Sequence, residues 1–198
     1  MAGSAGKVVK AKLVLLGDMG AGKTNLALRF VRGQFFDCQE PTVGATYFTQ
    51  TLSVKEATIN FDVWDTAGQE RYHSMAPLYY RNATAALLVY DISDKHSFVR
   101  AKKLVQELLT EETPIPVLSL VGNKADLETE REVATEEAET LSQENGLFFM
   151  ETSAKTSHNI NELFYEIAKR VAEVCPQQPS DIDLQNEIQN RRFSCCSG

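Results

Sequence analysis

One short loop constrains the fold of this 198-residue chain more than any other feature. Residues 17–24 read Gly-Asp-Met-Gly-Ala-Gly-Lys-Thr, which matches the spacing G-x-x-x-x-G-K-[ST]. A continuous apolar run, residues 10–17, precedes the loop, and a helical pattern over residues 22–33 follows it. A glycine-rich loop between a buried strand and a helix points backbone N–H groups at an anion. The sequence therefore predicts a phosphate-binding loop, in which Lys23 reaches the outer phosphates and Thr24 contacts Mg²⁺.

Strand-like and helical patterns alternate along the rest of the chain. The patterns predict strands over residues 48–54, 58–65, 85–91, 116–121 and 147–151, and helices over residues 97–110, 135–145 and from Asn159 onward. Asn159 is a favourable helix N-cap because Glu162 follows three residues later. A short turn at residues 55–57 predicts a hairpin. We expect an α/β fold, a single domain with a mainly parallel six-stranded sheet and helices on both faces, whose ligand binds at the carboxyl edge of the sheet.

The composition is that of a soluble globular protein, with 43% hydrophobic and 24% charged residues. A net charge of −7 argues against broad nucleic-acid binding, which needs a basic face. No apolar run is long enough to cross a bilayer, and the first residues lack the apolar core of a signal peptide. We expect residues 1–9 to be a flexible N-terminus, residues 10–175 the folded domain, and residues 176–198 a disordered tail rich in Gln, Asn and Ser.

Two further clusters, each after a predicted strand, indicate which nucleotide is bound. In Asp65-Thr66-Ala67-Gly68-Gln69, the carboxylate can hold Mg²⁺ and Gly68 can offer a backbone N–H to a γ-phosphate. In Asn123-Lys124-Ala125-Asp126, the carboxylate can accept two hydrogen bonds from the N1–H and 2-amino groups of guanine, a pair of donors that adenine lacks. By itself the second cluster is also a common turn. After a phosphate loop and D-x-x-G, it predicts GTP.

These motifs together resemble a small GTPase of the Ras superfamily, and the chain is similar to Rab proteins over nearly its whole length. The stretches that carry the resemblance are residues 17–24, 64–72, 123–126 and 151–155. Within the Rab proteins the chain resembles the early-endosome subfamily, especially its plant forms, through residues 71–74, 144–147 and 161–168. The resemblance implies a single P-loop GTPase domain that cycles between GDP- and GTP-bound states and regulates endosomal vesicle trafficking and membrane fusion.

The resemblance also assigns roles to single residues. Phe35 covers one face of the guanine, although an ordinary core aromatic is the alternative, and Lys124 lies along the other face. The Ala154 backbone N–H contacts O6 of the base. Thr42 ligates Mg²⁺ only with GTP bound, when its N–H holds the γ-phosphate together with that of Gly68. The implied nucleotide-binding residues are Gly20, Ala21, Gly22, Lys23, Thr24, Asn25, Phe35, Asp37, Thr42, Gly68, Asn123, Lys124, Asp126, Ser153, Ala154 and Lys155, and the implied Mg²⁺ ligands are Thr24, Thr42 and Asp65.

For hydrolysis, the resemblance implies that Gln69 orients the attacking water, with Lys23, Thr42 and Gly68 at the phosphates. The segment 33–42 contains no arginine, so a partner must supply one, which is worth about 10³–10⁵ in rate. We therefore expect slow intrinsic hydrolysis controlled by an activating protein. Met19 stands where many family members have a small residue, which leaves the response to that partner open.

Further residues indicate partners and a membrane anchor. Tyr47, Trp64 and Tyr79 match an aromatic triad that Rab proteins use to meet effectors, although Tyr47 replaces the usual phenylalanine and all three could be core. Cys195 and Cys196 resemble the doubly geranylgeranylated ends of Rab tails.

The resemblance therefore implies a monomer that meets an exchange factor, an activating protein, effectors, a GDP-dissociation inhibitor and a prenylation escort. It places the protein on the cytoplasmic face of endosomal membranes, with a cytosolic inhibitor-bound pool. Two other hypotheses stay open at this point. A weakly hydrolysing GTP-dependent scaffold is disfavoured by an intact Gln69, and a nucleotide kinase is disfavoured by residues 123–126.

Overall fold

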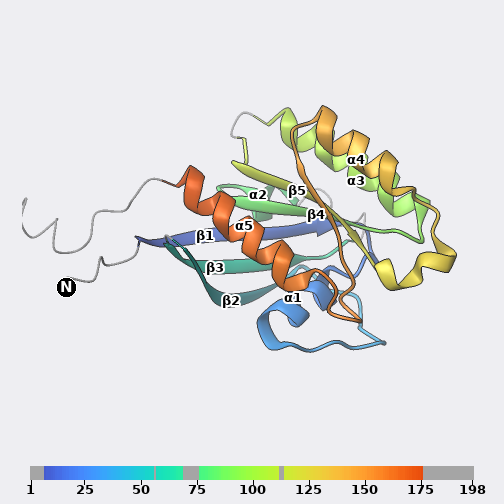
Figure 1. Ribbon diagram of the computed structural model, residues 1–198, viewed down its shortest axis with the longest axis horizontal. Helices are drawn as coiled ribbons and strands as arrows, with labels where there is room; N and C mark the ends of the chain where they lie inside the picture. The colour runs from blue at the N-terminus through green and yellow to red at the C-terminus, as the bar shows by residue number, and fades with distance from the viewer. Residues whose placement is uncertain (1–6, 56, 69–75, 112–113, 176–198) are drawn as a thin grey trace, which may run out of the picture.

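The computed structural model describes residues 7–55, 57–68, 76–111 and 114–175 (Figure 1). Its strands are β1 (Lys7–Gly17), β2 (Ala45–Val54), β3 (Ala57–Thr66), β4 (Ala85–Asp91), β5 (Val117–Asn123) and β6 (Phe148–Glu151). Its helices are α1 (Lys23–Arg32), α2 (Ala76–Tyr80), α3 (Lys95–Leu109), the 3₁₀ helix η2 (Ala125–Glu130), α4 (Thr135–Glu144) and α5 (Ile160–Val174). The sheet order is β2-β3-β1-β4-β5-β6, and every pairing is parallel except that of β2 with β3. The predicted fold class is confirmed.

Helices cover both faces of this sheet, and strand periodicity explains why. Alternate residues of β1, from Val9 to Leu15, pack beneath α1 and α5, which cross one face (Figure 1). Val14 and Leu16 point to the opposite face and pack with apolar residues of α3 and α4. Every residue of the central strand β4 is buried, as expected for a parallel strand covered on both sides.

The strand register brings polar side chains to one edge of the sheet. Leu15 of β1 pairs with Asp65 of β3, and Asp91 of β4 pairs with Asn123 of β5. Because these strands are parallel and end at the same level, the loops after β1, β3, β5 and β6 open at the same carboxyl edge. This edge carries the site described below.

Most predicted elements are confirmed within a few residues, and strand 85–91 is confirmed with the same bounds. The predicted hairpin of β2 and β3 is confirmed as an antiparallel pair. β1 begins at Lys7 rather than residue 10, because residues 7–9 pair with β3. The wider domain limits stay a prediction, because residues 1–6 and 176–198 lie outside the described ranges. Within the described ranges, no helix is long and apolar enough to span a membrane.

The predicted N-cap of α5 is confirmed, but the side-chain hydrogen bond expected of a capping box is wrong. Asn159 is the N-cap residue, but its backbone is left-handed, with φ of 56°, and its side chain makes no capping hydrogen bond. Instead, its Nδ2 donates to the carbonyl oxygen of Glu151 at 2.8 Å. Asn159 therefore ties the start of α5 to the end of β6, because a long-range acceptor competes successfully with the local cap.

Candidate functional site

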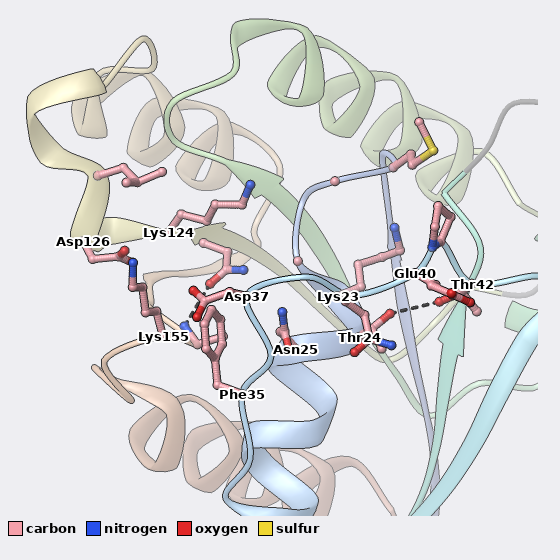
Figure 2. Close-up of a pocket in the computed structure, with 18 of the residues that line it drawn as sticks. Lys23, Thr24, Asn25, Phe35, Asp37, Glu40, Thr42, Lys124, Asp126 and Lys155 are labelled. Atoms are coloured by element: carbon pink, nitrogen blue, oxygen red, sulfur yellow. Dashed lines mark hydrogen bonds between the residues drawn. The ribbon is translucent and has the colours of Figure 1, made fainter.

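A cavity of about 460 Å³ opens at the carboxyl edge of the sheet, within the size range of small-molecule sites (Figure 2). The loops after β1, β5 and β6 form its floor and sides, and the segment after α1 forms another wall. Of the sixteen implied nucleotide-binding residues, Gly20, Gly22, Lys23, Thr24, Asn25, Phe35, Asp37, Thr42, Asn123, Lys124, Asp126, Ala154 and Lys155 line the cavity. Segments far apart in sequence therefore meet in one site.

The phosphate loop is held tightly to the end of β5. The Asn123 side chain donates to the carbonyl oxygen of Ala21 at 2.9 Å. Gly22 has φ of 86°, and a Cβ there would lie 2.3 Å from Asn123 Nδ2, so both the backbone conformation and the space require glycine. The loop and the base-side motif thus share one structural unit.

Lys23 points into the phosphate loop with its side chain almost completely buried. The residue is only 5% exposed, and its Nζ donates to the carbonyl oxygens of Gly17 at 2.9 Å and Asp18 at 2.7 Å. Burial lowers the pKa of Lys23 to about 8, although Asp65 and Asp18 oppose the shift. Among the described residues, the hydrogen-bond partners of this buried ammonium are uncharged carbonyl oxygens, so an anionic ligand would further compensate its charge.

Asp65 lies behind the phosphate loop next to two hydroxyl groups. Its Oδ2 accepts hydrogen bonds from Thr24 Oγ1 at 2.7 Å and Thr42 Oγ1 at 3.3 Å, and the two threonine oxygens lie 3.0 Å apart (Figure 2). Its Oδ1 is buried and has no hydrogen-bond partner among the residues that the structure describes. Burial raises the pKa of Asp65, against the hydrogen bond from Thr24 and the charge of Lys23.

This arrangement fits a magnesium ion. Two hydroxyls and a carboxylate are the hard oxygen donors that Mg²⁺ prefers, and a cation there would neutralise the buried charge and satisfy the free oxygen of Asp65. The described ranges contain no group of three or more His, Cys, Asp or Glu side chains around one metal position. Asp65 is thus the carboxylate of this set, and threonine hydroxyls supply its other two donors.

At the other end of the cavity, the loops after β5 and β6 are joined to each other. Asp126 Oδ1 accepts a hydrogen bond from Ser153 Oγ, and the Ala154 N–H lies 3.3 Å from Asn123 Oδ1. The Lys124 ammonium pairs with Asp91 at 2.7 Å. Ser153 and Ala154 are buried, whereas Asp126 is exposed toward the cavity. The carboxylate of Asp126 is thus oriented by one donor and keeps further lone pairs for a ligand.

The wall after α1 is anchored by a side chain of that helix. Asn25 Nδ2 donates to the Phe36 carbonyl at 2.8 Å, and Asn25 Oδ1 accepts from the Phe36 N–H at 3.1 Å. Phe35 is half-buried and lines the cavity, with the Arg29 guanidinium 5.8 Å from its ring centre. The alternative of a core aromatic is therefore wrong for Phe35.

Gly68 and Met19 meet at the phosphate end. A Cβ on Gly68 would lie 2.3 Å from the backbone nitrogen of Met19 and 2.4 Å from the carbonyl carbon of Asp18, so the two loops touch through their backbones. Met19 is 54% exposed and lines the cavity. Gln69 lies outside the described residues, so its expected role stays a prediction.

The three aromatic residues expected to meet effectors lie together, with Tyr47 on β2, Trp64 on β3 and Tyr79 on α2. Tyr47 and Trp64 ring centres are 5.4 Å apart, and those of Trp64 and Tyr79 are 6.4 Å apart. Tyr47 is half exposed, and its hydroxyl donates to Asp62 at 2.5 Å. The extra hydroxyl is thus bonded within the protein. Cys195 and Cys196 lie outside the described residues.

Sequence reasoning missed two arginines that support the site. Arg29 of α1 donates to the carbonyl oxygens of Ala154 at 2.8 Å and Lys155 at 3.0 Å, which holds the loop after β6 against α1. Arg131 connects Glu128 of η2, the segment after β5, to Glu151, the last residue of β6. No local motif marks either residue, because the loop carbonyls that Arg29 binds lie more than 100 positions away and Arg131 binds ordinary acids and a backbone carbonyl.

Comparisons with known proteins agree with this geometry. The sequence model of the Ras family matches residues 12–173. The chain is 56% identical to the Ras-related protein RHN1 of Nicotiana plumbaginifolia and 54% identical to the Ras-related protein RABF2b of Arabidopsis thaliana, each over 100% of both chains. It is 56% identical to the Ras-related protein Rab5 of Nicotiana tabacum over 96% of both chains. The chain therefore belongs to the Ras family of small GTPases, as a Rab protein similar to the plant members of the early-endosome, Rab5-type subfamily.

Proposed function

We propose that this protein is a Rab-type switch that binds GTP or GDP with Mg²⁺, hydrolyses GTP and regulates endosomal vesicle trafficking. One observation carries the proposal. A single cavity is lined by Lys23, by Thr24 and Thr42, which bond to Asp65 behind them, and by Asp126, which Ser153 bonds from behind. The first two suit a magnesium-bound polyphosphate and the third suits a guanine base, and the cavity is large enough to hold both ends of one nucleotide.

In this proposal, separate residues read the two ends of the nucleotide. Asp126 accepts the N1–H and 2-amino hydrogens of guanine, Phe35 and Lys124 flank the base, and the Ala154 N–H turns to O6. Ser153 supports this role because its hydroxyl holds one oxygen of Asp126 in place. At the phosphates, backbone N–H groups of residues 20–25 surround the anion, and Asp37 and Lys155 close the rim.

For hydrolysis, we propose that Lys23 and the N–H groups of Thr42 and Gly68 stabilise charge that develops on the γ-phosphate, while Gln69 orients the attacking water. Mg²⁺ held by Thr24, Thr42 and Asp65 supplies further charge neutralisation when it is bound. No arginine lies in the segment 33–42, so a partner's arginine would complete the charge stabilisation.

Loss of the γ-phosphate removes the contacts of Thr42 and Gly68, so both loops can relax. We propose that effectors recognise the GTP state through Tyr47, Trp64 and Tyr79, which lie on strands and a helix next to these loops. An exchange factor and an activating protein would set the direction of the cycle.

Membrane attachment would depend on the last residues. A single lipid chain anchors only marginally, and the residues nearby include acids as well as Arg191 and Arg192, so no basic cluster assists. We propose a geranylgeranyl group on each of Cys195 and Cys196, added with a prenylation escort. A GDP-dissociation inhibitor that shields both chains would maintain a cytosolic pool.

Intact-mass analysis of the protein from eukaryotic cells tests the lipid proposal directly. Two prenyl groups are expected. Replacing both Cys195 and Cys196 with serine should give a protein that still cycles GTP but no longer sediments with membranes, and either single change should weaken attachment. An unmodified C-terminus, or membrane residence of the double variant, would contradict the proposal.

The nucleotide itself is tested by denaturing purified protein and separating the released molecules by ion-exchange chromatography. GDP or GTP is expected at close to one per chain. A single-turnover hydrolysis time course, with Gln69→Leu as the matched control, then separates a GTPase from a scaffold that only binds. Adenine nucleotide, or transfer of phosphate to an acceptor other than water, would refute the proposed function.

A further inference from the structure

Arg131 lies between the two segments that form the base end of the cavity, although it does not line the cavity itself. It directly follows η2, which begins at Ala125 within the N-K-x-D motif. Its guanidinium reaches Glu151, the last residue of β6, which directly precedes the loop that contains Ser153. Arg131 is therefore placed to couple the two loops from outside.

Every nitrogen of the Arg131 guanidinium donates hydrogen bonds within the protein. Nη1 and Nη2 each donate to one oxygen of Glu151 at 2.8 Å, which is the paired geometry that an arginine and a carboxylate favour. Nε and Nη2 donate to Glu128 of η2 at 3.0 and 2.7 Å, and Nη1 also donates to the Val133 carbonyl at 3.0 Å. One side chain thus bonds to both segments at once.

The two halves of this contact differ in burial. The Arg131 and Glu151 side chains are only 16% and 17% exposed, whereas Glu128 is 68% exposed. Glu151 also accepts from Thr135 Oγ1 at 3.1 Å. Removing Arg131 would leave the Glu151 carboxylate shielded from water without its charge partner, which is far more costly than losing the exposed contact with Glu128.

The segment η2 needs such a tie because packing does not hold it. It buries none of its residues, and Leu127 departs from helical backbone with φ of −92° and ψ of 37°. On the cavity side, η2 itself is joined to the loop after β6 by a backbone bond from the Ala125 N–H to the Thr152 carbonyl at 3.0 Å and by the Asp126–Ser153 side-chain bond. Arg131 provides the tie at the far end of η2.

We propose that Arg131 is a positioning residue for base recognition. By holding Glu128 and Glu151 together, it keeps Asp126 aligned with Ser153 and thereby sets how slowly guanine nucleotide dissociates and how strongly the 2-amino group of the base is recognised. This inference rests on the proposed function, because it assumes that Asp126 contacts guanine.

The test compares dissociation of GDP with that of inosine diphosphate, whose base lacks the 2-amino group. Rates are measured in excess Mg²⁺ for the wild type, Arg131→Ala, Arg131→Lys and Glu166→Ala. The last is a matched control, because Glu166 forms ion pairs with Lys169 and Arg170 within α5, away from both loops. Melting temperatures of all four proteins are recorded alongside.

Arg131→Ala should release GDP about tenfold faster or more. It loses charged hydrogen bonds, each of which changes the equilibrium between the aligned and the open arrangement of the two loops by roughly a factor of ten. Release of inosine diphosphate should accelerate less, so the ratio of the two rates should narrow. Arg131→Lys keeps the charge but not the paired geometry and should recover part of that ratio. Glu166→Ala should match the wild type in both rates.

Unchanged rates for Arg131→Ala would overturn the inference. Equal acceleration of both nucleotides together with a lower melting temperature would also overturn it, because that result indicates a purely structural role. A wild-type protein that does not retain GDP at all would instead refute the proposed function, and the two failures are therefore distinguishable.

Discussion

Replacement of Asp126 by asparagine tests the base-recognition proposal most directly. One oxygen of this carboxylate accepts from Ser153, so in Asp126→Asn the amide oxygen should take that position and the NH₂ group should occupy the other. The NH₂ group would then face the 2-amino group of guanine, donor against donor. Xanthine carries an oxygen at the same position and would accept from it.

The size of the change follows from these contacts. The variant loses one hydrogen bond to a charged acceptor, which contributes about 1.5–3 kcal/mol, and leaves a donor of the base unsatisfied, which costs about 1–3 kcal/mol. The sum of about 2.5–6 kcal/mol corresponds to a roughly 10²–10⁴-fold weaker affinity for GDP. Binding of xanthosine diphosphate avoids both losses, so this nucleotide should become the preferred ligand.

The assay is displacement of a fluorescent nucleotide by GDP and by xanthosine diphosphate. Ser153→Ala is the matched control, since it removes the hydrogen bond that orients Asp126 but keeps both carboxylate oxygens of Asp126 as acceptors. This variant should weaken GDP binding without creating affinity for xanthosine diphosphate. If Asp126→Asn binds GDP as the wild type does and ignores xanthosine diphosphate, Asp126 does not read the base.

Three further predictions follow from the packing and the phosphate end of the site. Phe164→Ala should lower the free energy of unfolding by about 3–5 kcal/mol in chemical denaturation, because this fully buried ring stacks on Phe30 at 3.6 Å; a loss below about 1 kcal/mol would contradict that packing. Gly68→Ala should slow single-turnover hydrolysis strongly, since its Cβ would lie 2.3 Å from backbone of the phosphate loop, and an unaffected rate would exclude this loop contact from the active state. Thr24→Asn should retain GDP but lose Mg²⁺-dependent GTP binding, whereas Gln69→Leu should accumulate GTP. The bound nucleotide of each variant is identified by high-performance chromatography. Loss of all nucleotide from both variants would contradict the prediction.

The elements that sequence predicted well are those whose burial leaves a periodic pattern. β4 is buried along its whole length, so the two ends of its continuous apolar run predicted the two ends of the strand. The helices α2 and η2 were not predicted. The first has 5 residues and the second has 6 with none buried, so neither is long or apolar enough to show a helical period. The side-chain partner of Asn159 could not be predicted from local spacing, because Glu151 is its neighbour only in the folded chain.

The residues of the site also fall into those that the sequence predicts and those that it does not. The residues proposed to contact phosphate stand in short motifs, since one loop must supply several groups at fixed spacing. The residues that hold those loops in place do not. Arg29 and Arg131 act on carbonyl and carboxylate groups that only the sheet register brings near, so no local spacing marks them.

The two ends of the cavity are also built with unequal rigidity, which suits a switch. At the base end, Asn123, Thr152 and Ser153 are buried. Asn123 bonds to Thr152 and to the phosphate loop, and Ser153 bonds to Asp126 and Thr156. At the phosphate end, residues 36–41 are all exposed. Exposed segments with few packed contacts open at low free energy, whereas buried, bonded loops do not.

That difference decides which part of the protein can respond to hydrolysis. The γ-phosphate would be contacted by Thr42, at the end of the exposed segment, and by Gly68, which touches the phosphate loop through its backbone. The base would be contacted by loops that Arg29 and Arg131 hold from outside. Loss of one phosphate can therefore release Thr42 without loosening the base, so the protein can change the surface it presents to partners while it retains GDP.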